Sequence, residues 1–180
     1  GPRRLRPLFP CGDQATNDRP WAVRNGDAVR LSETLKPGLV LIRPEVKGRE
    51  DLFRLFASTL VEAGAVSQAD EVVARLRERE AILSTGIGRG VAVPHAQVPG
   101  LGRLVMSAST HPCGLDYPAL DHQPVRLVFC LLGDATTAAD HLAGLARLAR
   151  LARRDNALEP LVTCTGGEDF VRTLERIEDS

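Results

Sequence analysis

The sequence predicts a single α/β domain, an α/β sandwich in which helices flank a central mixed β-sheet. Segments with a helical spacing of apolar residues alternate with short apolar runs, as expected where helices cover the faces of a sheet. The run at 125–132 is apolar almost throughout, which is typical of a central strand. A chain of 180 residues suits one domain with a sizeable core and a short additional segment.

Residues 1–30 are predicted to be a flexible amino-terminal tail or linker, and residues 31–180 the domain. The first segment mixes prolines with Asn, Asp and Gly and shows no sustained period of helix or strand. Trp21 is the only tryptophan of the chain. Two interpretations of it stay open: it packs this segment against the domain, or it lies exposed within the segment.

The order of elements in the domain follows from periodicity and from residues that start or stop helices. We expect a turn at 31–35, strands at 39–42, 91–93, 104–109, 125–132 and 161–164, and helices at 48–64, 67–80, 138–153 and 167–177. Gly64 is suited to end the first helix. Ser67 and Asp70 have the spacing of a capping box at the start of the second. Thr137 is suited to cap the third.

Composition excludes several classes of protein. The chain has 23 Lys and Arg against 23 Asp and Glu, so its zero net charge offers no basic field for nucleic acid. No apolar run approaches the roughly 20 residues of a membrane helix, and the first residues lack an apolar signal core, so we expect no membrane insertion. The four cysteines, at 11, 113, 130 and 164, follow no metal-ligand spacing, which favours reduced thiols in a cytoplasmic protein.

The stretch 79–95, REAILSTGIGRGVAVPH, carries the strongest chemical pattern of the chain. Its glycines allow positive φ angles and a close approach to a ligand, and its two hydroxyl residues lie beside free N–H groups. The residues expected to bind an anion are Ser84, Thr85, Gly86 and Gly88. Because Pro94 lacks an N–H and cannot continue an interior strand, His95 is predicted to lie at a strand end.

An imidazole beside such an anion cradle indicates phosphoryl transfer to His95. A histidine with an ordinary pKa of about 6.5 is mostly neutral at pH 7 and is then a nucleophile. Arg79 is available to hold phosphate oxygens, although an arginine paired with Glu78 or Glu80 at a helix end would look the same. His141 stands at a helix start, where free N–H groups favour an anion.

No cofactor or metal is predicted. The glycine run precedes a strand instead of following one, so it is not a dinucleotide-binding motif. The spacing of the His and Cys residues does not support a metal site, since no pair of candidate ligands has helical or Cys-x-x-Cys spacing. These candidates are His95, His111, His122, His141 and Cys113.

The stretch 79–95 resembles the motif of enzyme IIA of the fructose/mannitol class of the bacterial sugar phosphotransferase system, including its nitrogen-regulatory branch. The resemblance extends over residues 31–179, where 121–125 is similar to the family's Asp-x-x-Pro-Val turn and His141 to its second histidine. It implies that His95 is phosphorylated, on Nε2, with His141 across the pocket and Arg79 at the site. His122 stands where the family usually carries Gly or Asn, so a loop role is expected for it.

Three functions fit this reading. In the first, His95 accepts a phosphoryl group from an HPr-like phosphocarrier protein and passes it to a separate enzyme IIB for sugar uptake. In the second, the phosphorylation state of His95 controls binding to regulatory target proteins; the absence of a fused IIB domain tilts the expectation modestly towards it. The third is a phosphate-sensing or metal-sensing domain that does not transfer. Docking of a donor protein predicts a shallow site rimmed by apolar residues.

Overall fold

The computed structural model describes residues 29–180. Residues 1–28 of the predicted tail, Trp21 among them, lie outside the described residues. Val29 and Arg30, which the prediction assigned to the tail, pack on the domain: Val29 is buried, and Arg30 forms an ion pair with Asp179 at 2.8 Å.

The described residues form a six-stranded sheet and two layers of helices. The strands are β1 (Leu35–Ile42), β2 (Gly86–Gly88), β3 (Val91–Ala92), β4 (His95–Gln97), β5 (Val105–Leu115) and β6 (Val125–Gly133). The helices are α1 (Leu31–Thr34), α2 (Arg49–Glu62), α3 (Ala69–Ile82), α4 (Ala138–Ala152), α5 (Leu158–Val162) and α6 (Gly167–Asp179), with a 3-10 turn η1 (Ala135–Thr137) before α4.

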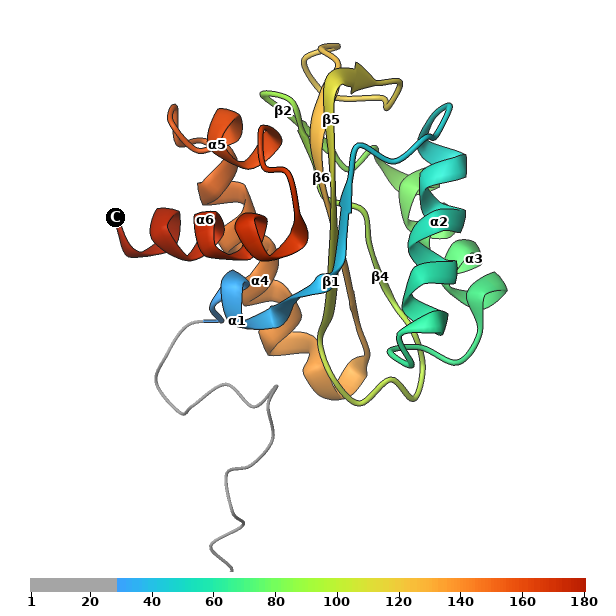
Figure 1. The fold of residues 1–180 in the computed structure, drawn as a ribbon. Helices are drawn as coiled ribbons and strands as arrows, with labels where there is room; N and C mark the ends of the chain where they lie inside the picture. Colours follow the sequence, from blue (N-terminus) through green and yellow to red (C-terminus); the bar gives the residue numbers. More distant parts are fainter. Residues whose placement is uncertain (1–28) are drawn as a thin grey trace, which may run out of the picture.

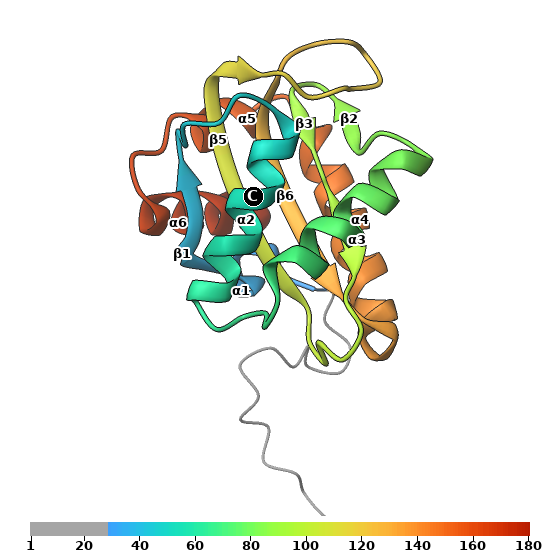
Figure 2. The ribbon, with the colours of Figure 1, turned by 90° about the vertical axis from the view of Figure 1, so that its right-hand side faces the viewer.

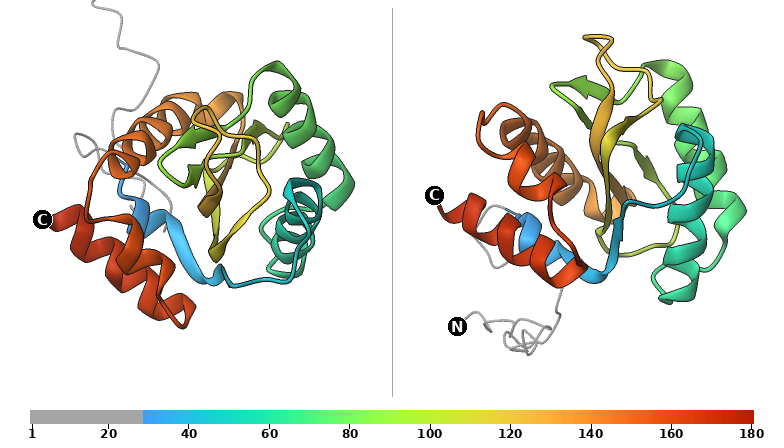
Figure 3. Two further views of the ribbon diagram at one scale, coloured as in Figure 1. Left: turned by 90° about the horizontal axis from the view of Figure 1, so that it is seen from above. Right: turned by 45° about the horizontal axis from the view of Figure 1, so that its top comes forward.

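The sheet lies between the helices and is mixed, so the predicted fold class is confirmed. Figure 1 shows it edge on, with α2 and α3 on one face and α4, α5 and α6 on the other, and the view from above in Figure 3 shows the same two layers. The strand order is β1-β5-β6-β3-β2, with β4 also paired to β6. The β1–β5, β3–β6 and β4–β6 pairs are parallel, and the β5–β6 and β2–β3 pairs are antiparallel.

Strand β6 is the central strand that the sequence predicts. Its residues are buried except Arg126, and it pairs with β5 on one side and with β3 and β4 on the other. Strands β3 and β4 follow it in one register, since Ala92 pairs with Val128 and His95 with Leu131. Proline therefore interrupts this edge only locally. The Pro94 carbonyl still accepts the Leu131 N–H at 3.0 Å, and His95 lies at a strand end, as predicted, but at the start of β4.

The helical pattern of α2 and α3 is confirmed, but one predicted cap is wrong. Helix α2 buries Phe53 and Phe56 and ends at Glu62, and Gly64, with a φ of +69°, lies in the turn that closes the helix. The N-cap of α3 is Gln68, without a side-chain bond, so the predicted capping box of Ser67 and Asp70 does not form.

Two predictions near the carboxyl end need correction. Residues 161–164 were expected as a strand, but Leu161 and Val162 end the short helix α5. A short apolar run does not distinguish a buried strand from a buried helical turn, and Pro160 is tolerated in the first turn, where its missing N–H has no helical partner. Thr137 stands at the N-cap of α4, yet its hydroxyl bonds to Asp134 of the preceding turn and not to α4.

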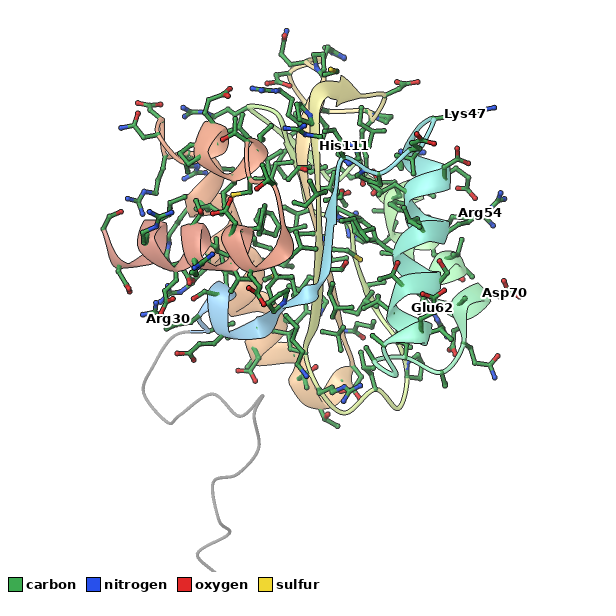
Figure 4. The ribbon with its side chains drawn as sticks, viewed as in Figure 1. Arg30, Lys47, Arg54, Glu62, Asp70 and His111 are labelled. Carbon is green, nitrogen blue, oxygen red and sulfur yellow. The ribbon has the colours of Figure 1, made fainter. Side chains whose placement is uncertain are left out.

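The outer surface of the α2–α3 layer is charged. In Figure 4 the side chains of Lys47, Arg54, Glu62 and Asp70 point away from the sheet, whereas His111 lies at the end of the sheet. Among residues 29–180, no helix has the length and apolar character needed to cross a membrane.

Candidate functional site

His95 lies at the open edge of the sheet, between one helix from each layer. In Figure 2 the strand that carries it runs beside α3, with α4 behind the same edge. The side chain is half-buried and faces a pocket of about 570 Å³. Residues from three elements line this pocket, among them Arg79 and Ile82 of α3, His95 and Gln97 of β4, and His141 and Leu142 of α4.

Two hydrogen bonds define the chemical state of the His95 ring. Nδ1 lies 2.8 Å from the Val93 carbonyl, an acceptor only, so Nδ1 carries the proton. Nε2 then carries the lone pair, which accepts a hydrogen bond from Nε of Arg79 at 3.2 Å. The ring is thus a neutral imidazole with its lone pair on Nε2.

The surroundings of His95 favour that neutral form. Burial lowers its pKa below the ordinary value, and the nearby Arg79 charge lowers it further. These effects outweigh the bond to the Val93 carbonyl and the charge of Glu80, which favour the protonated ring. His95 therefore stays neutral and nucleophilic at pH 7.

His141 faces His95 across the pocket, as the resemblance implies. It lies in the first turn of α4, is 7% exposed, and its ring centroid is 5.7 Å from that of His95 at an angle of 71°. Burial lowers its pKa to about 4, with a smaller contribution from His95. Its Nδ1 is buried without a hydrogen-bond partner, which leaves Nε2 as the ring nitrogen available to the pocket.

Helix α4 comes this close because the connection from β6 is compact. Asp134 is buried and accepts the N–H and hydroxyl of Thr136 and the N–H of Gly102, which fixes the turn before α4 and lowers the pKa of Asp134. A Cβ on Gly133 would lie 2.9 Å from Nδ1 of His141 and 2.7 Å from Oγ1 of Thr137. Glycine at this position therefore allows the His141 ring to approach β6.

The four residues predicted to bind a phosphoryl group do not line the pocket. Thr85 and Ser84 donate hydrogen bonds to other residues of the domain. The N–H and hydroxyl of Thr85 donate to Glu80, and the hydroxyl of Ser84 donates to the Pro118 carbonyl. A Cβ on Gly86 would lie 2.2 Å from the Pro118 oxygen, and one on Gly88 would lie 3.3 Å from Asp121. The loop folds against residues 116–121.

Glu80 is the residue that the sequence reasoning missed. The sequence pattern indicates only an ion pair between Glu80 and Arg79, but the Glu80 carboxylate is buried and accepts hydrogen bonds from Thr85, Tyr117 and Arg49. The sequence feature that could have indicated this role is a carboxylate at the end of a helix, followed four and five positions later by hydroxyl residues.

The turn at 121–125 supports the glycine loop from outside the pocket. Asp121 accepts the N–H of Arg89 at 2.8 Å and that of Gln123 at 3.1 Å, and these bonds lower its pKa. His122 is an exposed loop residue with φ +57°, and His111 is buried against Ser109. Among the described residues no group of three or more His, Cys, Asp or Glu side chains is placed to hold a metal ion.

Comparisons with known proteins show the family of the chain. Residues 33–177 match the family described as "Phosphoenolpyruvate-dependent sugar phosphotransferase system, EIIA 2". The fructose-specific EIIA component of Haloferax volcanii is 27% identical over 136 residues, which are 76% of this chain and 88% of that protein. The crystal structure of the nitrogen regulatory protein IIA-Ntr of Neisseria meningitidis superposes with a TM-score of 0.74 at 28% identity, over 79% of this chain and 97% of that one.

A third relative is similar in fold alone. The Escherichia coli enzyme IIA-Mtl, solved in complex with phosphorylated enzyme IIB-Mtl, has a TM-score of 0.65 at 19% identity, over 79% of this chain and 97% of that one. The family match covers most of the described residues and includes the whole pocket. The chain therefore belongs to the EIIA type 2 family of the phosphoenolpyruvate-dependent sugar phosphotransferase system, and it is a phosphoryl carrier of that system or of its nitrogen-regulatory branch.

Proposed function

We propose that His95 is the residue that carries the phosphoryl group, on Nε2. It accepts the group from a phosphohistidine of an HPr-like protein and passes it to an acceptor protein. The observation that carries this proposal is the bond from Nδ1 to the Val93 carbonyl, which places the lone pair on Nε2, on the side of the ring that faces Arg79 and the pocket.

The transfer needs no proton to move on His95. The Nε2 lone pair forms the new N–P bond, the N–P bond of the donor breaks, and its electron pair returns to the donor nitrogen. Nδ1 keeps its proton and its bond to Val93 throughout, so the product is an imidazolium ring, protonated on Nδ1, that bears a phosphoryl dianion on Nε2.

Arg79 takes part in this step by leaving Nε2. Its Nε occupies the position 3.2 Å from Nε2 that the phosphorus must reach, while its Nη1 donates to the Leu83 carbonyl. A small movement of the guanidinium clears the nitrogen and turns its planar donors towards the phosphoryl oxygens. The arginine thus protects the nucleophile before transfer and stabilises the charge after it.

His141 stabilises the phosphoryl group from the opposite side. Its lowered pKa keeps the ring neutral before transfer, so no cation competes at the site, and its Nε2–H is available to the incoming oxygens. It also lies in the first turn of α4, where the unpaired N–H groups of the helix favour an anion.

The rim of the pocket suits a protein donor. Ile82 and Leu142 are 80% and 70% exposed, and they face the pocket from opposite helices. Exposed apolar side chains around a polar centre are typical of a docking surface and match the apolar rim expected from the sequence. The free thiols of Cys113, Cys130 and Cys164 suit the reducing cytoplasm in which we place this exchange.

The acceptor is proposed in two forms. Enzyme IIB is one, because the IIA-Mtl relative was solved with phosphorylated IIB-Mtl. A regulatory target protein is the other, because the IIA-Ntr relative is a nitrogen regulatory protein. Both use the same phosphorylated His95.

Intact-mass measurement after incubation with phosphoenolpyruvate, enzyme I and HPr tests the proposal. We expect one acid-labile phosphate adduct on the wild type, an equal adduct on His122→Ala, and none on His95→Ala. An adduct that survives in His95→Ala would refute the assignment. Adding purified IIB proteins to the phosphorylated domain then separates the acceptors, since loss of the adduct identifies a IIB acceptor.

A further inference from the structure

The carboxylate of Glu80 organises a buried polar cluster behind the pocket. Oε1 accepts the N–H of Thr85 at 3.0 Å and the Arg49 guanidinium at 3.4 Å. Oε2 accepts the Thr85 hydroxyl at 2.6 Å and the Tyr117 hydroxyl at 3.2 Å. A carboxylate that is 7% exposed is costly unless its oxygens are satisfied, and here both are.

This cluster connects to His95 through two further hydrogen bonds. The carbonyl of Thr85 accepts the N–H of Val93 at 2.9 Å. The carbonyl of Val93 accepts the proton of His95 Nδ1 at 2.8 Å. The peptide groups of Thr85 and Val93 therefore link the carboxylate to the imidazole, without direct contact between Glu80 and His95.

We propose that Glu80 is a positioning residue for phosphoryl transfer: by holding the backbone of Thr85, and through it Val93, it keeps the His95 ring oriented with its proton on Nδ1 and its lone pair on Nε2. The inference rests on the proposed function of His95 and adds to it. Without this support the Val93 carbonyl is free to turn away, and the Nε2–H tautomer, which cannot attack, becomes populated.

The proposal can be tested because a role that depends on the length of the Glu80 side chain and one that depends on its charge predict opposite effects of two substitutions. Glu80→Gln keeps the length: its amide oxygen still accepts the Thr85 N–H, and its NH2 donates to hydroxyls that can turn to accept. Glu80→Asp keeps the charge, but it is one methylene shorter and no longer reaches Thr85. A purely electrostatic role of Glu80 would be retained by Asp and lost in Gln.

The experiment measures the tautomer and the reaction separately. The ¹⁵N resonances of the His95 ring distinguish a protonated from an unprotonated nitrogen, and rapid quench with phosphorylated HPr gives the single-turnover rate. We expect Nδ1–H in the wild type and in Glu80→Gln, with rates within a few-fold of each other. In Glu80→Asp we expect a mixture of tautomers and a rate lower by on the order of 100-fold, the loss that follows from a misplacement of about 1 Å.

Tyr117→Phe is the matched control. It removes one hydroxyl from the same cluster and leaves the link from Thr85 to Val93 intact, so the tautomer and the rate should not change. Three results would overturn the proposal. The first is a proton on Nε2 of His95 in the wild type. The others are mixed tautomers with a slow rate in Glu80→Gln, or a wild-type tautomer and rate in Glu80→Asp. Because the tautomer is read without any phosphoryl donor, a failure of transfer in the wild type counts against the proposed function and leaves this test standing.

Discussion

Acidification from pH 7 to pH 5 is expected to destabilise the domain through His141. The pKa of this buried histidine is about 4 in the folded protein and about 6.5, the ordinary value, in the unfolded chain. Below pH 6.5 the unfolded state binds a proton that the folded state does not accept until pH 4. The free energy of unfolding therefore falls as the pH decreases through this window, by about 1.36 kcal/mol for each pH unit, or about 2 kcal/mol at pH 5.

His111 adds an equal fall, because burial also lowers its pKa to about 4. Several carboxyl groups contribute little in this window. The pKa values of Asp121, Asp134 and Glu159 are lowered, so the stability that they provide is present above the ordinary carboxyl pKa and is lost only at lower pH.

Urea unfolding at pH 7 and pH 5, followed by circular dichroism, measures this effect. His141→Leu removes one buried titrating group and should lose about 2 kcal/mol less than the wild type between the two pH values. His111→Leu should do the same, and the double variant should show both effects, since separated sites add. A His141→Leu variant with the pH dependence of the wild type would show that this ring is not held neutral by burial, and the reasoning about its donor role would fail.

Three further changes test the site. Arg79→Ala should slow single-turnover phosphorylation of His95 by on the order of 100-fold, and Arg79→Lys by less. Arg54→Ala removes an exposed arginine that pairs with Glu50 and does not line the pocket, so it should leave the rate near that of the wild type. An unaffected rate in Arg79→Ala would remove this residue from the mechanism. Gly86→Ala should lower the free energy of unfolding, measured in urea, by about 1–3 kcal/mol, because the added Cβ would meet the Pro118 oxygen at 2.2 Å. Gly38→Ala is the control, since its Cβ enters open space, and equal stability of the two variants would contradict the close approach at Gly86. Leu142→Asp should raise the KM for phosphorylated HPr about tenfold without loss of stability. Leu120→Asp should leave the KM unchanged, since Leu120 is 62% exposed but does not line the pocket. Equal effects on KM would mean that the rim is not the docking surface.

The sequence predicts those features of the fold and the site that depend on local pattern. Helices α2, α3, α4 and α6 follow from periodicity, and the apolar run of β6 indicates its central position. The run at 161–164 failed because four apolar residues carry no period that separates a strand from a helical turn. The convergence of Arg79, His95 and His141 on one pocket came from resemblance, since it depends on how α3 and α4 pack on opposite faces of the sheet.

The glycine loop shows how one sequence pattern fits two different structural roles. Glycines, hydroxyl residues and free N–H groups are needed wherever a backbone approaches another group closely, whether that group is a phosphate or another segment of the protein. Here the segment at 116–121 and the Glu80 carboxylate take up the donors of Thr85 and the space beside Gly86. In the proposed transfer, the bonds that hold the His95 ring do not change, and Arg79, which bonds to Nε2, is the group that moves.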